Sequence, residues 1–238
     1  MNIERWRGGV LAVCLGTVLL AGCATGPNAN PQDPLEPLNR TVSRFNDGVD
    51  EAVMKPVATA YQETLPRPVR TGVNNFFANL RDAWSAVNAL LQFRPREAAE
   101  NFMRFNVNTF FGLGGILDIA TEMRLERTTL DFGQTMGRWG VPSGPYLVLP
   151  FFGPSSVRDA TGLVVDTQGD VVSQGVDHVP TRNSLYVLRA TDTRAGLLRA
   201  GELIDEAALD KYTFTRDAYL QRRQSLINGG TKEERYDE

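Results

Sequence analysis

The sequence predicts a mainly helical protein with a single domain and one irregular hairpin loop. Apolar residues recur at helical spacing in several long segments of the chain. Between these segments, a stretch rich in glycine and proline excludes a long helix or a central strand. The chain has 238 residues, which is enough for one domain with a substantial core.

The first residues have the layout of a secretory signal peptide. Two arginines precede an apolar run from Val10 to Leu20, and small residues follow it. The run ends in Leu20-Ala21-Gly22-Cys23, which is typical of a bacterial lipobox, so we expect residues 1–22 to be removed and the Cys23 thiol to be acylated. The alternative is a soluble exported protein with an incidental cysteine. Since Cys14 leaves with the signal peptide, the mature chain would contain no disulfide.

Residues 23–32 are small, polar and proline-containing, which predicts a flexible, lipidated tether. A coil of this length reaches about 15–20 Å, so the domain that follows should lie at the membrane surface. Ala24, directly after the lipidated cysteine, resembles the sorting position of lipoproteins sent to the outer membrane. We expect the helical domain at 33–228 and a disordered tail at 229–238.

The first helix should begin near Asn39 and end before Pro56, because proline interrupts a helix interior. Its apolar face contains residues spaced three or four apart: Leu38, Val42, Phe45, Val49 and Val53. The same period extends from Val69 to Leu91, which predicts a second helix about 35 Å long.

A third helix is expected from about Arg96, after Pro95. Apolar side chains cover most of its circumference, which is more than one core contact needs. The remaining narrow polar stripe consists of Asn101, Arg104 and Asn108. Three glycines are expected to end this helix: Gly112, Gly114 and Gly115.

Phenylalanine is concentrated in the stretch of chain that contains the second and third helices. Seven of the twelve phenylalanines lie there: Phe76, Phe77, Phe93, Phe102, Phe105, Phe110 and Phe111. One interpretation is a phenylalanine-rich buried core. The other is a lipid-facing belt, which the short tether and the wide apolar arc favour.

The segment from Asp131 to Ser156 predicts a bent hairpin or loop, with Tyr146 to Leu149 as a short extended piece. Seven glycines or prolines precede Phe151 in it: Gly133, Gly137, Gly140, Pro142, Gly144, Pro145 and Pro150. Short helical turns are expected between Arg158 and His178. Further helices should run from about Asn183 to near Asp210 and from Tyr212 to Ile227.

The residue inventory argues against most enzymes and against nucleic-acid binding. One histidine and no surviving thiol exclude a Cys/His zinc site, no phosphate-binding glycine motif follows a strand, and the net charge is −3. We expect no catalytic residue, cofactor or metal. A lipid hydrolase that uses Ser143 and His178 is a minor alternative. Three acidic residues are expected to be caps and ion-pair partners: Asp118, Asp159 and Asp166.

Four long motifs, in the same order, resemble the MlaA (VacJ) family of outer-membrane lipoproteins: DPLEPLNRTVSRFNDGVDEAVMKPVA, RFNVNTFFGLGGILDIA, DFGQTMGRWGVPSGPYLVLPFFGPSSVRDATG and DAYLQRRQSLING. The resemblance implies a ring-shaped helical protein in the inner leaflet of the outer membrane, with an amphipathic central channel. It further implies that the protein lies beside porin trimers, removes phospholipids that have strayed into the outer leaflet, and passes them to the periplasmic carrier MlaC. The lipid would be moved and not chemically changed.

The resemblance also implies gating residues. Phe45, Asn46 and Asp47 match a family stretch associated with channel opening, although an aromatic residue can stand at the position of Asp47. The loop from Gly133 to Tyr146 matches the flexible hairpin that lines the channel. Its implied gating residues are Gly133, Gly137, Gly140, Pro142 and Gly144, of which Pro142 should stiffen the loop. A lipoprotein adaptor that docks periplasmic partners without transporting lipid is the main alternative function.

Overall fold

The computed structural model describes residues 30–228, so the expected signal peptide, Cys23 and the expected tail lie outside the described part of the chain. Helices predominate within this part, and a two-stranded hairpin is its one sheet. The prediction of a mainly helical fold is therefore confirmed. Between residues 30 and 228, no helix is both long enough and apolar enough to cross a membrane.

The first three helical elements form one continuous curved rod: α2 (Glu36–Val49), the π-helical turn η1 (Asp50–Met54) and α3 (Lys55–Thr64). The prediction that the helix ends before Pro56 is wrong. Pro56 lies in the first turn of α3, where a backbone donor is not needed. The wider π turn makes this possible, because the Lys55 N–H donates to the Asp50 carbonyl, five residues earlier.

The helix α4 (Arg67–Leu91) has the length that the sequence predicts, at 25 residues, and α5 (Pro95–Phe110) packs against it. After α5 ends, the chain turns through Gly112, Gly114 and Gly115 to the short α6 (Ile119–Glu122). Gly115 has a φ of +97°, and a Cβ there would lie 2.7 Å from the Asn79 side-chain amide of α4. Glycine therefore lets this turn press directly onto α4.

The glycine- and proline-rich segment contains a short helix as well as a hairpin. The helix α7 (Phe132–Arg138) begins at Asp131, whose side chain accepts from the Gln134 N–H. The interpretation of the whole span from Gly133 to Tyr146 as a loop is therefore wrong, because Gly133 and Gly137 lie in α7; the loop is shorter and contains Gly140, Pro142 and Gly144. The strands β1 (Tyr146–Leu149) and β2 (Gly153–Ser156) pair antiparallel, from Tyr146 opposite Ser156 to Leu149 opposite Gly153. The expected extended piece at β1 is confirmed.

Five helices complete the chain: α8 (Val157–Gly169), α9 (Val171–Gly175), α10 (Val179–Gly196), α11 (Leu198–Ala207) and α12 (Lys211–Ile227). The expectation of only short turns after Arg158 is wrong, since α8 alone has 13 residues. The expected helices before Asp210 and after Tyr212 are present as α10, α11 and α12. Asp210 caps α12 by accepting from the Tyr212 and Thr213 N–H groups.

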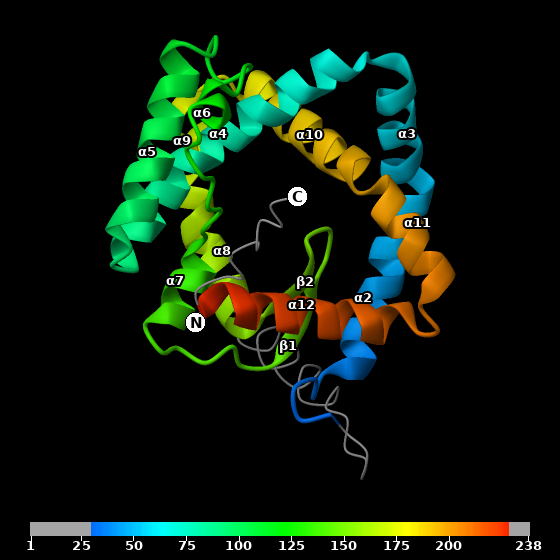
Figure 1. Cartoon of the computed structure of the whole chain (residues 1–238). Coiled ribbons are helices and arrows are strands. Elements are labelled where there is room, and N and C mark those ends of the chain that lie inside the picture. Colours follow the sequence, from blue (N-terminus) through cyan, green and yellow to red (C-terminus); the bar gives the residue numbers. More distant parts are fainter. Residues whose placement is uncertain (1–29, 229–238) are drawn as a thin grey trace, which may run out of the picture.

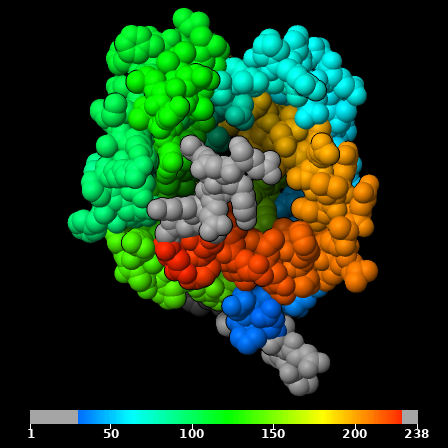
Figure 2. Space-filling view, in the orientation of Figure 1, coloured from blue at the N-terminus to red at the C-terminus, as the bar shows by residue number. Residues whose placement is uncertain are grey.

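The helices follow one another around an open centre (Figure 1). In that view, α4 and α10 form the upper side, α3 and α11 the right side, α12 and part of α2 the lower side, and α5, α7 and α8 the left side. The space-filling view shows a hollow between these elements (Figure 2). The described helices therefore form a ring rather than a bundle with one apolar core.

Candidate functional site

Most of the fully buried larger side chains in the ring are polar, and many of its large apolar side chains are exposed. The predicted polar stripe of α5 faces inward: the side chains of Asn101, Arg104 and Asn108 are at most 1% exposed. On the opposite side of α5, Phe102 is 61% exposed and Phe110 is 77% exposed. Buried polar groups and exposed large apolar side chains are the informative exceptions in a folded protein. This distribution suits a protein whose surroundings are partly apolar.

Four of the seven clustered phenylalanines are exposed: Phe93, Phe102, Phe110 and Phe111. Phe77, in contrast, is buried. The interpretation of this cluster as a buried core is therefore wrong for most of its members. We call the exposed apolar surface of α4, α5 and the turn after α5 the apolar belt: Leu90, Phe93, Phe102, Met103, Phe110, Phe111 and Leu113.

A charged network under the apolar belt joins α5 to α4 and to the segment after α5. The Arg104 guanidinium donates to both carboxylate oxygens of Asp118 at 2.8 Å, and its Nε lies 3.4 Å from Asp82 on α4. Arg127 donates to Asp82 at 2.9 Å. Two carboxylates and two guanidiniums are thus paired within the fold, so that Arg104 is not left as an isolated buried charge.

Burial and pairing act in opposite directions on these carboxyl groups. Burial raises the pKa of Asp82, although hydrogen bonds from Arg127 and the charge of Arg104 oppose it. At Asp118 burial also favours the neutral acid, but hydrogen bonds from Thr121 and Asn108 and the charge of Arg104 outweigh it and lower the pKa. The expected role of Asp118 as a cap and ion-pair partner is confirmed, since it also caps α6.

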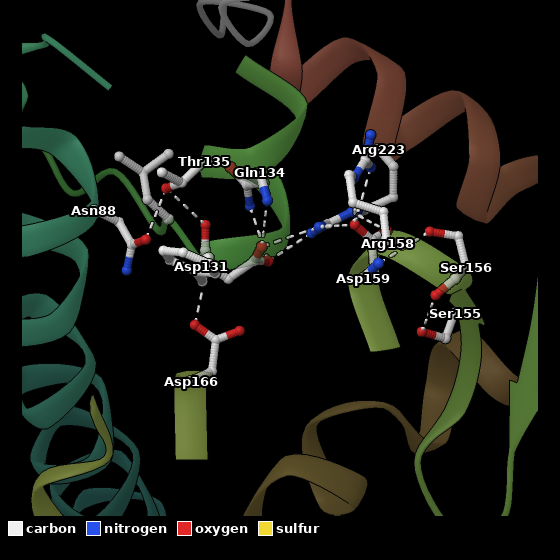
Figure 3. Close-up of polar contacts among 12 residues, drawn as sticks. Asn88, Asp131, Gln134, Thr135, Ser155, Ser156, Arg158, Asp159, Asp166 and Arg223 are labelled. Carbon is white, nitrogen blue, oxygen red and sulfur yellow. Dashed lines mark hydrogen bonds and ion pairs between the residues drawn. The ribbon is translucent and has the colours of Figure 1, made fainter. Parts of the chain in front are cut away.

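A second polar cluster joins α12 to α7 and α8 (Figure 3). The Arg223 guanidinium donates to Asp131 at 2.5 and 2.9 Å and to Asp159 at 2.8 and 2.9 Å. The Tyr219 hydroxyl donates to Asp159 at 2.5 Å. Asp166 of α8 accepts from the Trp84 indole at 2.7 Å and from the Phe132 N–H at 2.9 Å. Asp159 is thus an ion-pair partner, as expected. The expectation is wrong for Asp166, which accepts from two neutral donors and neither caps a helix nor forms an ion pair among the described residues.

A third cluster joins the two ends of the domain. The buried Asp33 carboxylate accepts from the Asn39 side-chain amide at 2.8 Å and from the Tyr212 hydroxyl at 2.5 Å. Asn39 also donates to the Tyr146 carbonyl and accepts from the Val148 N–H of β1. The start of the domain, the hairpin and α12 are therefore connected through one asparagine and one aspartate.

The three gating residues implied near the end of α2 contact two other elements. The Asn46 side chain donates to the Leu149 carbonyl at 3.0 Å and accepts from the Phe151 N–H at 2.9 Å, so it holds the turn of the hairpin. The Phe45 and Phe151 rings pack edge to face, with centroids 5.4 Å apart. Asp47 lies 3.4 Å from Lys211 at the start of α12. The structure therefore brings this segment of α2 to the hairpin.

The five implied loop residues have two kinds of environment. Gly133 and Gly137 are close-packed in α7, and a Cβ on Gly133 would lie 2.6 Å from Asp159. Gly140 and Gly144 have positive φ angles of +91° and +67°, and a Cβ on Gly140 would meet nothing within 4 Å. Pro142 is exposed between them. Gly140 and Gly144 are thus the two loop positions whose backbone conformation favours glycine.

The residues of the hydrolase alternative are not arranged as a catalytic pair. His178 is exposed at the start of α10, where its Nδ1 lies 2.8 Å from the Thr181 hydroxyl. Ser143 lies in the loop before β1, and its carbonyl accepts from the Arg158 N–H. Asp118, Asp159 and Asp166 are engaged elsewhere, as described above.

Sequence reasoning missed Asp33, Arg223 and the exposed hairpin turn as parts of the site. Asp33 and Arg223 lie in two of the motifs that carry the family resemblance, DPLEPLN and DAYLQRRQSLING. An acidic residue before the first helix and an arginine in the last helix could have been tested as partners. Nothing in their spacing indicates these contacts, because the partners of Arg223 are 64 and 92 positions away and Tyr212 is 179 positions from Asp33.

The described helices form a ring. Charged clusters are buried between neighbouring helices, and an apolar belt is exposed on the surface. These features define a class of membrane-associated helical protein. Comparison with known proteins identifies the group within this class. The chain belongs to the MlaA lipoprotein family, whose family model matches residues 31–226.

Relatives with curated names match nearly the whole chain. The intermembrane phospholipid transport system lipoprotein MlaA of Shigella flexneri and that of Escherichia coli (strain K12) are each 39% identical over 225 residues, which is 92% of this chain and 88% of the relative. The protein of the same name from Haemophilus influenzae is 34% identical over 93% of this chain and 91% of its own.

A solved structure from the work "Structural basis for maintenance of bacterial outer membrane lipid asymmetry" has the same fold. Its TM-score is 0.72 at 36% sequence identity, and the match covers 82% of this chain and 99% of that chain. The fold of this chain is therefore shared, over most of its length, with that solved structure.

Proposed function

We propose that this protein is an outer-membrane lipoprotein that removes mislocalised phospholipids from the outer leaflet through the centre of its ring. The relatives are named as parts of an intermembrane phospholipid transport system, and the solved structure concerns outer-membrane lipid asymmetry. The lipid is moved across and out of the membrane and is not chemically changed. Cys23, outside the described residues, carries the anchoring acyl chains.

The observation that carries this proposal is where the polar and apolar side chains of the ring lie: the polar clusters are buried between helices, and the apolar belt is exposed. The apolar belt can lie among acyl chains, because every helix satisfies its own backbone hydrogen bonds. A phospholipid headgroup is costly to bring into hydrocarbon. A hollow in the ring lowers that cost by offering the headgroup a path within the protein (Figure 2). The belt meanwhile keeps the domain in the inner leaflet, at the periplasmic face.

The loop before β1 and the end of α2 form the gate in this proposal. Gly140 and Gly144 permit the loop to bend, and Pro142 between them restricts it. Asn46 and Phe45 fix the hairpin that follows the loop. Asp47 links the same end of α2 to α12 through Lys211.

Two partners complete the proposed path. Porin trimers would hold the ring in the outer membrane, and the periplasmic carrier MlaC would receive the phospholipid. The carrier would give transport its direction, because this chain has no nucleotide-binding motif in its sequence.

Outer-leaflet phospholipid in cells tests the proposal. The full-length lipoprotein is expressed in a Gram-negative strain that lacks its own family member, and surface phosphatidylethanolamine is measured with a membrane-impermeant amine-reactive probe. We expect the chain to lower surface labelling to the level of the parent strain. Unchanged labelling, with the lipoprotein present in the outer membrane, would contradict the transport function.

The same strain separates transport from the adaptor alternative. An adaptor would still bind porins or the carrier while surface phosphatidylethanolamine stayed high. Co-purification of the partners, measured beside surface labelling, therefore distinguishes a transporting ring from a docking platform.

A further inference from the structure

The turn between β1 and β2 presents two phenylalanine rings to its surroundings. Phe151 is 73% exposed and Phe152 is 71% exposed. In Figure 1 this turn reaches into the space that the helices surround, whereas α5 with the apolar belt lies on the left flank of the ring. The two rings are thus separate from the belt, which the proposed function already assigns to the surrounding leaflet.

The turn is held in place and is not a loose loop. Asn46 bonds to it on both sides, at the Leu149 carbonyl and the Phe151 N–H. Phe151 has a φ of +65°, which is unfavourable for a residue with a side chain. Such a conformation persists where the surrounding structure imposes it, and it is found preferentially at functional positions. The fold therefore holds the aromatic turn in one position, although this requires an unfavourable backbone conformation at Phe151.

The chemistry of the turn points to an uncharged, apolar ligand. No ionisable residue occurs from Leu147 to Val157. Asp47, which follows the Asn46 that holds the turn, is already paired with Lys211. A phosphate or an ammonium headgroup would find no opposite charge in this segment, whereas an acyl chain would cover both rings and remove them from water.

We propose that Phe151 and Phe152 form an acyl-chain contact site within the ring, which binds the tails of a phospholipid in transit. This inference rests on the proposed transport function and adds a ligand group and two residues to it. Asn46 and Phe45 are positioning residues, because they act by holding Phe151. Phe152 has no aromatic partner among residues 30–228, so its ring is the better probe.

Substitution of Phe152 tests the site by transport. We expect Phe152→Ser to slow the loss of surface phosphatidylethanolamine about three- to tenfold, because an apolar contact is lost. Phe152→Leu should keep most of the rate. The matched control is Phe214→Ser, at a half-exposed phenylalanine of α12 that lies outside the proposed site. A rate for Phe152→Ser equal to that of the unsubstituted chain would overturn the proposal.

Crosslinking identifies the source of the acyl chain. The photoreactive residue benzoylphenylalanine replaces Phe152 or, for comparison, Phe102 of the apolar belt, in cells labelled with ³²P-phosphate. Phospholipid is then driven into the outer leaflet by chelating divalent cations with EDTA. We expect the amount of ³²P-phospholipid crosslinked at position 152 to rise as outer-leaflet phospholipid rises. The amount crosslinked at position 102 should stay constant. A constant signal at position 152 would assign the turn to bulk leaflet lipid and overturn the proposal.

Failure of the transport function has a different signature from failure of the acyl-chain site. If the unsubstituted chain does not lower surface labelling, the transport function itself is wrong. If the unsubstituted chain transports and Phe152→Ser transports equally well, only the acyl-chain site is wrong. Circular dichroism of Phe152→Ser in detergent should match that of the unsubstituted chain, which excludes misfolding as the cause of slower transport.

Discussion

Asp159 illustrates how single residues hold this ring together. Its carboxylate accepts hydrogen bonds from Arg223 and Tyr219 of α12 and from Arg158 of its own helix. Because Arg223 also binds Asp131 at the start of α7, one guanidinium connects three helices (Figure 3). Burial alone would raise the pKa of Asp159, but the hydrogen bonds from Arg223 and Tyr219 lower it.

Removing this carboxylate should destabilise the domain. We expect Asp159→Asn to lower the free energy of unfolding by about 2–4 kcal/mol, since Arg223 and Arg158 lose a buried partner. Urea unfolding in detergent, followed by tryptophan fluorescence, measures the loss. The matched control is Asp217→Asn, at a half-exposed carboxylate paired with Arg216, for which we expect less than about 1 kcal/mol. Equal losses in both variants would contradict the structural role of Asp159.

The lowered pKa of Asp159 also predicts a pH dependence. An unfolded aspartate titrates near pH 4, and the folded group titrates below that, so the unfolded state binds more protons as the pH falls. The stabilisation is therefore complete above about pH 4 and is lost as the pH falls through the folded pKa. Urea midpoints between pH 7 and pH 3 should fall less steeply in Asp159→Asn. If the urea midpoints of the two chains fall in parallel with pH, the Asp159 carboxyl does not contribute to the pH dependence of stability.

At the residue scale, the sequence indicated roles more readily than partners. Asp159 was expected to be an ion-pair partner, and it is one. Its partner Arg223 is 64 positions away, and no local pattern reports a pair that forms only when α12 packs on α8. The same applies to Asp33 and Tyr212, which are 179 positions apart.

Among the helices, the contact between α7 and α8 depends on two glycines. A Cβ on Gly162 of α8 would lie 2.6 Å from the Gly133 nitrogen and 2.8 Å from its Cα. The two helices therefore approach each other with backbone against backbone. This contact fixes α7, and with it the start of the loop that contains Gly140 and Gly144.

Filling this contact should separate the two helices. We expect Gly162→Val to lower the free energy of unfolding by about 1–3 kcal/mol, because a side chain cannot fit without a shift of backbone. Thermal unfolding followed by circular dichroism measures the change. The control is Gly48→Ala in α2, where a Cβ meets nothing within 4 Å and should be neutral or slightly stabilising. Normal stability of Gly162→Val would show that α7 and α8 are not held in close contact.

The loop before β1 gives a functional prediction. Gly144 has a φ of +67°, and a Cβ there would lie 3.2 Å from Val157. A side chain in this conformation costs about 1–2 kcal/mol, so Gly144→Val should shift the loop and impair lipid removal with little loss of folded protein. Surface labelling of phosphatidylethanolamine measures lipid removal. The amount of lipoprotein in the outer membrane measures how much folded protein remains. Unchanged surface labelling would contradict the role of this loop as a gate.

Helix prediction from sequence succeeded where periodicity was strong and failed where a special turn intervened. The period from Val69 to Leu91 predicts α4 correctly. Pro56 misled the prediction, because a π turn before it admits proline without ending the rod. In the glycine-rich segment, the cap at Asp131 starts α7 in spite of Gly133 and Gly137. These two glycines are close-packed in α7, and their implied gating roles stay a prediction.

For the whole molecule, periodicity identifies the two faces of a helix but not the surroundings of each face. The stripe of Asn101, Arg104 and Asn108 was visible in the sequence, and the same pattern would suit a helix with its polar side in water. The structure shows these residues to be buried. The ring shape followed from family resemblance rather than from local signals, because it depends on contacts between distant parts of the chain.

The apolar belt should govern attachment to the membrane when the acyl anchor is removed. We expect Cys23→Ala, in the mature chain, to remain membrane-bound or to require detergent, since the exposed rings of Phe102 and Phe110 prefer hydrocarbon. Adding Phe102→Gln and Phe110→Gln should lower partition into phospholipid vesicles by more than about tenfold, because each ring contributes roughly 1.5–3 kcal/mol. Phe214→Gln, added to Cys23→Ala alone, is the control and should change partition little. Vesicle flotation measures the bound fraction. A Cys23→Ala chain that is monomeric and fully soluble without detergent would show that the belt does not lie in lipid, and the leaflet-embedded ring would then be wrong.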